Sequence, residues 1–263
     1  MTTHALPLTG LSVAVTRPED DGDELGGLLE RSGAVPVLIP LTRILPAGDD
    51  TPLRRAVADA GAYDWIIFTS ARAVRAFGAV AATDSPGRLT ARIVAVGPAT
   101  AAAVQALTGR DPDVVPDQTP GAGIVPALLQ HGPLQNLRVL WPRAEKPRPE
   151  LPTALLAAGA LLDDPIAYRT VPDPAAARQL ADLAAAGRID VITFTAPSAV
   201  ECFADVLDGQ TPPRCLIAVI GPATADAARA RGLEVHVEPD QPLISALVSA
   251  LARYRTHGPA GHQ

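Results

Sequence analysis

The sequence predicts an α/β protein made of two similar, doubly wound parallel-sheet lobes. Continuously apolar segments alternate with helical patterns, which is typical of parallel sheets covered on both faces. The segment Asp64–Ser70 is answered by Asp190–Ala196, an offset of 126 residues from residue 64 to residue 190. The 263 residues are 48% hydrophobic, enough for two cores. We therefore expect an internal duplication, with a ligand-binding cleft between the lobes.

Two further segments repeat at nearly the same spacing. The offset of 126 also carries Leu11–Arg17 onto Leu137–Arg143 (11 to 137), and an offset of 124 carries Gly97–Ala101 onto Gly221–Ala225 (97 to 221). The repeats fall at successive strands and turns, so the duplicated unit contains several strands and helices and not a single motif.

The first half of the chain begins as strand, loop and helix. After the apolar run 11–15, Leu25, Leu28 and Leu29 recur at helical spacing, and Gly33 ends that helix. From Pro46 onward we expect a looser polar stretch. The strands expected in this half are 11–15, 35–41, 65–69, 92–96 and 114–115, and the later helices are 71–80, 100–107 and 124–130.

The second half repeats this order. The expected strands are 137–141, 161–168, 191–195, 216–220 and 235–237, with helices at 149–158 and 174–186. The polar end 256–263 contains Gly and Pro, and we expect it to be disordered.

Composition excludes several classes of protein. A net charge of −6 and a pI near 5.3 argue against a nucleic-acid-binding surface. No signal peptide and no membrane span is recognisable, so we expect a soluble, cytoplasmic protein. Cys202 and Cys215 are the only cysteines, and we expect both to be reduced and structural. The histidines are scattered without metal-ligand spacing, so no metal site is expected.

Hydroxyl residues gather where strands end and helices begin. Thr69, Ser70 and Arg72 follow one repeated strand, and Thr195 and Ser198 follow the other. Hydroxyls and free N–H groups at a helix N-terminus bind anions, although helix capping is the better explanation of each residue when it is taken singly.

The Gly-Pro-Ala-Thr segments place Thr100 and Thr224 at the next two strand ends. Because ligands of open parallel sheets bind beyond the carboxyl ends of the strands, this recurrence favours a binding site over capping alone. The glycine spacing of a dinucleotide fingerprint or phosphate loop is absent, so a nucleotide is not expected.

Four more side chains are candidates. Arg17 and Arg143 occupy equivalent loops after strands, and Arg169 lies further along; a guanidinium matches a carboxylate, although a surface ion pair is the alternative for each. Tyr168 ends an apolar strand, where its phenol can donate a proton or simply be a buried structural group.

In their order and spacing these motifs resemble the uroporphyrinogen-III synthase family across nearly the whole chain. The segments that carry the resemblance are Thr16–Pro18, Phe68–Ser70, Gly97–Thr100, Tyr168–Thr170, Phe194–Ser198 and Gly221–Thr224. Ala196 departs from the family, in which a hydroxyl often stands at this position.

The resemblance implies a fold of two lobes joined by two strands near 39–45 and 166–171. Residues 1–40 and 172–263 would form the first, discontinuous lobe, and residues 41–171 the second, including the connecting strands.

The resemblance also implies a function. This is a cyclising hydro-lyase reaction that converts hydroxymethylbilane to uroporphyrinogen III, with loss of water and inversion of the last ring. The resemblance implies no metal or organic cofactor and a monomer, while the charge and the lack of an apolar span already argue against a nucleic-acid or membrane partner. Tyr168 would assist departure of the hydroxyl, and Thr69, Ser70, Thr100, Ser198 and Thr224 would bind the acidic arms of the substrate.

Two other functions fit the sequence. One is a tetrapyrrole-binding or regulatory protein that keeps the fold without the reaction, since the net acidity opposes the approach of an octacarboxylate. The other is a two-lobed binding protein for a smaller anion, against which the lack of a recognisable export signal counts.

Overall fold

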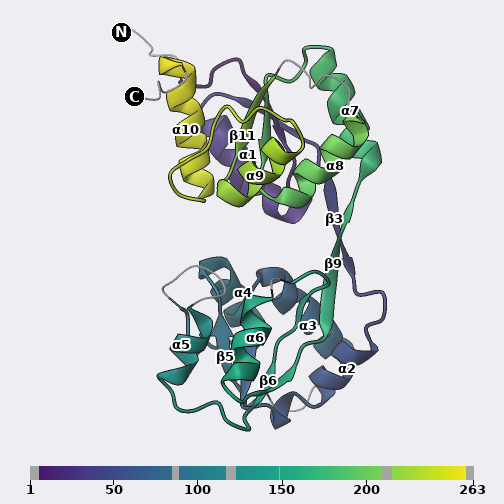
Figure 1. Ribbon diagram of the computed structural model, residues 1–263, viewed down its shortest axis with the longest axis vertical. Helices are drawn as coiled ribbons and strands as arrows, with labels where there is room; N and C mark the ends of the chain where they lie inside the picture. Colours follow the sequence, from purple (N-terminus) through teal and green to yellow (C-terminus); the bar gives the residue numbers. More distant parts are fainter. Residues whose placement is uncertain (1–5, 85–88, 117–122, 148, 209–214, 259–263) are drawn as a thin grey trace. The chain divides into compact units, whose positions relative to one another are not determined.

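The computed structural model describes residues 6–84, 89–116, 123–147, 149–208 and 215–258 (Figure 1). The chain divides into two compact units. Unit 1 contains Met1–Arg43 and Val171–Gln263, and unit 2 contains Ile44–Thr170. The predicted α/β class is confirmed, because each unit has its own parallel sheet.

Unit 1 is built on a four-stranded parallel sheet in the order β11-β10-β1-β2. Its strands are β1 (Ser12–Val15), β2 (Val35–Leu38), β10 (Val191–Phe194) and β11 (Leu216–Val219). The helices α7 (Pro174–Ala185), α8 (Pro197–Leu207) and α9 (Pro222–Ala230) cover one face, and α1 (Glu19–Arg31) and α10 (Ile244–His257) cover the other (Figure 1). Successive side chains of a strand point to opposite faces, so Ala14 joins the first core and Val13 the second.

Unit 2 has the same construction, with a parallel sheet in the order β5-β4-β6-β8. Its strands are β4 (Trp65–Phe68), β5 (Arg92–Ala95), β6 (Arg138–Leu140) and β8 (Leu161–Asp163). One face is covered by α2 (Thr51–Ala58), α3 (Ala71–Asp84) and α4 (Pro98–Thr108), and the other by α5 (Ile124–Leu129) and α6 (Glu150–Ala157); the short 3₁₀ turn η1 (Ala60–Ala62) follows α2.

The duplication crosses the two units. The first repeat supplies β1, β2, β4 and β5, and the second supplies β6, β8, β10 and β11. In unit 1, β10 and β11 from the second repeat lie beside β1 and β2 from the first. In unit 2, β4 and β5 from the first repeat lie beside β6 and β8 from the second, so the two sheets have the same strand order. Each unit therefore needs both halves of the sequence.

A third sheet of three strands has the order β3-β9-β7. It contains β3 (Thr42–Pro46), β7 (Arg143–Ala144) and β9 (Ile166–Pro172). The chain passes between the units inside β3 and inside β9, which are neighbours in this sheet.

The structure corrects some of the predicted elements. The strand expected at 161–168 is two strands, β8 and β9, in different sheets, separated by Asp164 and Pro165. The polar stretch after Pro46 contains α2, in which Pro52 occupies a first-turn position where no amide hydrogen is needed. Strand β7 was not predicted.

The predictions for the short strands and the chain end were also too simple. Residues 114 and 237 form only isolated bridges to β5 and β11. We expected residues 256–263 to be disordered, but α10 includes Thr256 and His257. Residues 259–263 lie outside the described residues. No helix within the described part of the chain combines the length and the apolar character needed to cross a bilayer.

Candidate functional site

The carboxyl ends of the unit 2 strands bring several predicted residues to one edge of the sheet. Because β4, β5 and β6 are parallel, Thr69, Gly97 and Trp141, which directly or almost directly follow them, lie at the same edge. This is the edge at which open α/β sheets bind ligands.

Ser70 lies at the start of α3 and has two polar contacts. Its Oγ accepts a hydrogen bond from the amide of Ala73 at 3.2 Å, which caps the helix. The same Oγ lies 3.2 Å from the hydroxyl of Tyr168 on β9. Both side chains are half-buried. One serine hydroxyl therefore caps α3 and contacts Tyr168 at the same time.

The Ser70–Tyr168 contact leaves one hydroxyl proton available. Two hydroxyls that share one hydrogen bond use one of their two protons in it. Ser70 Oγ is an acceptor toward Ala73, so that contact consumes no hydroxyl proton. Whichever hydroxyl donates in the pair, the other can donate to a ligand. The pair is thus a hydrogen-bond donor suited to an anionic or leaving oxygen.

Thr69 is held by a neighbouring strand end. The indole Nε1 of Trp141 donates to Thr69 Oγ1 at 3.3 Å. The hydroxyl proton of Thr69 is not used in this contact, because the indole is only a donor. Trp141 is 4% exposed and fixes the threonine from the end of β6. Arg72 is half-buried in the first turn of α3.

The start of α4 offers backbone donors more readily than side chains. Gly97 precedes the helix with φ of 83°, in the left-handed region, and Pro98 has no amide hydrogen. The amides of Ala99 and Thr100 have no acceptor within the helix, because they belong to its first turn. The Thr100 residue is only 4% exposed, so its hydroxyl is hardly accessible. The backbone amides are therefore the groups of this turn that can bind a ligand.

Arg143 is engaged in contacts within unit 2. Its Nε donates to Asp164 Oδ2 at 2.7 Å, and its Nη1 donates to the carbonyls of Ala144 and Glu145 at 3.1 and 3.3 Å. Its side chain is 18% exposed. These contacts occupy a large part of a guanidinium that was expected to bind substrate.

Unit 1 presents the equivalent groups at the carboxyl edge of its own sheet. Thr195 directly follows β10 and Ser198 lies in the first turn of α8, and both are half-buried. Thr224 in the first turn of α9 is 3% exposed. Arg17 follows β1; burial lowers the pKa of its guanidinium, while the nearby Glu24 raises it.

Two buried threonines tie the same strand ends together. Thr16 Oγ1 donates to the carbonyl of Thr193, and Thr193 Oγ1 donates to that of Ala14, both at 2.7 Å. They hold β1 beside β10 where Arg17 and Thr195 emerge.

The structure thus brings the predicted residues together in two sets. Thr69, Ser70, Arg72 and Thr100 share the strand-end edge of unit 2, where Ser70 meets Tyr168. Arg17, Thr195, Ser198 and Thr224 share the corresponding edge of unit 1. Trp141 and Asp164 were not predicted. Trp141 could have been found because it directly follows a repeated strand, whereas the pairing of Asp164 with Arg143 depends on β7.

Tyr63 is a second tyrosine of unit 2, and its contacts are structural. It is 4% exposed and donates to Asp163 Oδ2, and the guanidinium of Arg138 lies 4.7 Å from the centre of its ring. Burial, followed by the contact with Asp163, raises its pKa above the usual range.

Within the described residues, no group of three or more His, Cys, Asp or Glu side chains is placed so that it could hold a metal ion.

Comparison with known proteins gives a consistent result. The family model described as uroporphyrinogen-III synthase HemD matches residues 23–249. The uroporphyrinogen-III synthase of Synechococcus elongatus is 27% identical over 267 residues, covering 94% of this chain and 97% of that protein.

Two solved structures share the fold. A mutant uroporphyrinogen III synthase of Thermus thermophilus has a TM-score of 0.62 at 22% identity, covering 93% of this chain and 98% of that one. The uroporphyrinogen-III synthetase of Helicobacter pylori has a TM-score of 0.59 at 17% identity, covering 91% and 96%.

Proposed function

Because this chain belongs to the uroporphyrinogen-III synthase family, we propose that it cyclises hydroxymethylbilane to uroporphyrinogen III as a hydro-lyase. The linear tetrapyrrole loses water, and its last ring is inverted before the macrocycle closes. The observation that supports this most directly is the Ser70–Tyr168 hydroxyl pair, which lies in unit 2 and keeps a proton to donate.

In this proposal Tyr168 assists departure of the substrate's hydroxyl. The carbon–oxygen bond breaks as the pyrrole nitrogen supplies electrons, and the leaving oxygen takes the proton of Tyr168 and departs as water. The phenolate regains a proton when the closing ring loses one, so the reaction releases one water in total. Ser70 supports the phenolate by donating to it while still accepting from Ala73.

Holding the substrate folded is the other requirement, because unguided closure gives the macrocycle with its last ring uninverted. We propose that the carboxylate arms are bound at helix starts by hydroxyls, backbone amides and guanidinium groups. The candidates in unit 2 are Thr69, Ser70, Arg72 and Thr100, and those in unit 1 are Arg17, Thr195, Ser198 and Thr224. Arg143 on β7 was also expected to bind substrate, but its guanidinium is engaged by Asp164 and two carbonyls.

The candidates differ in access. Thr69, Ser70 and Ser198 are half-buried and can offer a hydroxyl directly. Thr100 and Thr224 are 4% and 3% exposed. We propose that Thr100 acts through its amide, and that Thr224, whose amide donates to the carbonyl of Gly221 at 3.0 Å, shapes the turn. We propose further that the protein acts in the cytoplasm as a monomer without a metal or organic cofactor.

The test supplies hydroxymethylbilane, generated in place by its synthase, and separates the oxidised porphyrins as isomers I and III by chromatography. Isomer III in excess over a protein-free control supports the proposal. Isomer I alone, with folded protein in excess, contradicts it and favours a tetrapyrrole-binding protein without the reaction. A sizing column run on the same sample tests the monomer.

A further inference from the structure

Strand β9 has an irregularity directly before Tyr168. Its parallel pairing with β7 joins Arg143 to Ile166 and Ala144 to Tyr168, so one step on β7 corresponds to two steps on β9. Ala167 is the extra residue. A bulge of this kind disturbs the alternation of side chains and re-aims those beside it.

The packing of β9 shows the effect of the bulge. Ala167 is 3% exposed within the core formed by α2, α3, α4 and the sheet, and Tyr168 packs against the same core. In a regular strand, two successive side chains would point to opposite faces. Here both side chains contact the same core, and the hydroxyl of Tyr168 lies 3.2 Å from Ser70 Oγ.

Arg143 contacts the segment before this bulge directly, and it is linked to the segment after the bulge through Glu145. Its backbone amide donates to the carbonyl of Pro165 at 3.0 Å, and its Nε donates to Asp164 before β9. Its Nη1 donates to the carbonyls of Ala144 and Glu145, and the amide of Glu145 in turn donates to the carbonyl of Tyr168 at 2.9 Å. One guanidinium thus connects the segment before the bulge with the segment that holds Tyr168.

We propose that Arg143 is a positioning residue for Tyr168, and that it acts by fixing the β9 bulge through Asp164 and the two carbonyls. If β9 slipped by one residue, Tyr168 would turn to the other face of the strand and lose Ser70. The catalytic relevance of this inference rests on the proposed role of Tyr168. It assigns to Arg143 a function other than the substrate binding considered above.

The test replaces Arg143 by Lys, which keeps the charge but cannot donate in three directions from a planar group. The readout is the NMR signal of tyrosine labelled with ¹³C at Cζ, which reports the environment of the phenol without any reaction. The chain has three tyrosines, so the Tyr168→Phe variant identifies the signal of Tyr168.

We expect Arg143→Lys to shift the Tyr168 signal and to lower kcat about tenfold while KM changes less than about twofold, as for a misplaced catalytic group. In the Tyr168→Phe background the same change should lower kcat by less than about twofold, because there is no phenol left to position. Asp164→Ala, at a side chain that is 42% exposed, removes one anchor and gives a second test should Arg143→Lys fail to fold.

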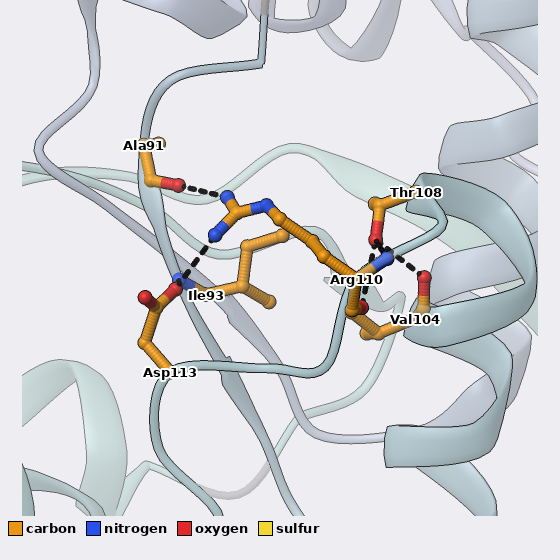
Figure 2. A network of polar contacts seen from close by, with 6 residues as sticks. All are labelled: Ala91, Ile93, Val104, Thr108, Arg110 and Asp113. Carbon is orange, nitrogen blue, oxygen red and sulfur yellow. Dashed lines mark hydrogen bonds and ion pairs between the residues drawn. The ribbon is translucent and has the colours of Figure 1, made fainter.

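Arg110 provides the matched control, shown in Figure 2. It also joins a carboxylate and a carbonyl, donating to Asp113 at 3.1 Å and to Ala91 at 2.6 Å. Ala91 directly precedes β5, so this contact lies at the amino edge of the unit 2 sheet. Arg110→Lys should leave the Tyr168 signal in place.

Three results would overturn the inference. These are an unchanged Tyr168 signal in folded Arg143→Lys and Asp164→Ala, an equal shift in Arg110→Lys, or a rise in KM with kcat unchanged, which indicates substrate binding. The proposed function fails separately, if the wild-type protein forms only isomer I. The NMR comparison still decides whether Arg143 positions the phenol in that case.

Discussion

The carboxylate of Asp190 accepts a hydrogen bond from the backbone amide of Ser12 at 2.7 Å, although 178 residues separate the two in sequence. The same bond exists in unit 2, where Asp64 accepts from the amide of Arg138 at 2.8 Å. Asp64 and Asp190 are equivalent in the repeat, as are Ser12 and Arg138, since both pairs differ by 126 positions (64 to 190 and 12 to 138). Each bond joins one repeat to the other.

This equivalence gives a prediction for stability. Asp64→Ala and Asp190→Ala should each lower the free energy of unfolding by about 1 kcal/mol, because each leaves a strand amide without its carboxylate partner at an exposed position. Urea denaturation followed by circular dichroism measures the effect. The corresponding Asn variants keep an acceptor oxygen and should lose less than half as much. A difference of more than about 1 kcal/mol between the two Ala variants would contradict the equivalence.

For the hydroxyl pair, Tyr168→Phe should lower kcat by about 10²-fold or more and leave the thermal midpoint nearly unchanged, because the ring remains packed while the proton donor is lost. Formation of isomer III over time gives the rate. Tyr254→Phe is the control, since Tyr254 lies on α10 against the ring of His236. Equal rates for Tyr168→Phe and the wild type would remove the acid role.

Ser70→Ala should affect both rate and stability. It removes the partner of Tyr168 and also the cap of α3, which should cost about 1 kcal/mol. Ser70→Thr keeps a hydroxyl and should recover most of both losses. The comparison needs urea titrations and isomer III rates on the same three proteins. A stable Ser70→Ala variant with full rate would argue that the contact is incidental.

The two glycines before α4 and α9 should respond differently to alanine. Gly97 has φ of 83°, where a side chain is strained, so Gly97→Ala should cost about 1–2 kcal/mol. Gly221 has extended backbone, and an added Cβ would meet Cβ and Cα of Pro242 at 3.2 and 3.8 Å, so Gly221→Ala should cost less than about 1 kcal/mol. Thermal unfolding of the two variants side by side checks the order, which the reverse ranking would refute.

Stability should also depend on pH through Cys215. Burial, with a smaller contribution from the charge of Asp190, raises the pKa of its thiol to about 11. An unfolded thiol titrates near pH 8.5, so the protonated thiol favours the folded state. Its contribution is complete below about pH 8.5 and is lost as the pH rises toward about 11.

The measurement compares the wild type with Cys215→Ser across that range. The free energy of unfolding of the wild type should fall more steeply with pH than that of the variant. Reaction of the folded protein with iodoacetamide at pH 8 should also be slower at Cys215 than in free cysteine. Parallel pH curves for the two proteins would show that the thiol does not titrate as described.

The strands that the sequence predicted are those with a continuous apolar run, such as 65–69 and 191–195, because full burial on both faces leaves an unmistakable pattern. Helix α2 was missed because its polar surroundings concealed Leu53, Ala56 and Val57, which are its buried residues. The duplication itself could have revealed it, since the helix predicted at 174–186 has its equivalent near residue 50 (174 − 124 = 50).

The site was predictable only in part, for a physical reason. Hydroxyls after a strand can be recognised from local order, so Ser70 and Tyr168 were both identified, but their contact spans 98 residues. The division of 161–168 into β8 and β9 was hidden because Ala167 and Ile166 continue the apolar pattern past Pro165. Without that division, the bulge and the contacts of Arg143 could not be foreseen.

The passage of the chain through β3 and β9 also determines the order in which the protein can be completed on the ribosome. Unit 2 is a continuous segment from Ile44 to Thr170, so its four strands have all been synthesised before β10 and β11 of unit 1. Strands β1 and β2 are made before the strands of unit 2, yet β1 waits for its neighbour β10 until residue 194 has been added. We therefore expect β1, although it is made before unit 2, to complete its native pairing after unit 2 has its strands, which makes it a part of the nascent chain that depends on protection from wrong partners.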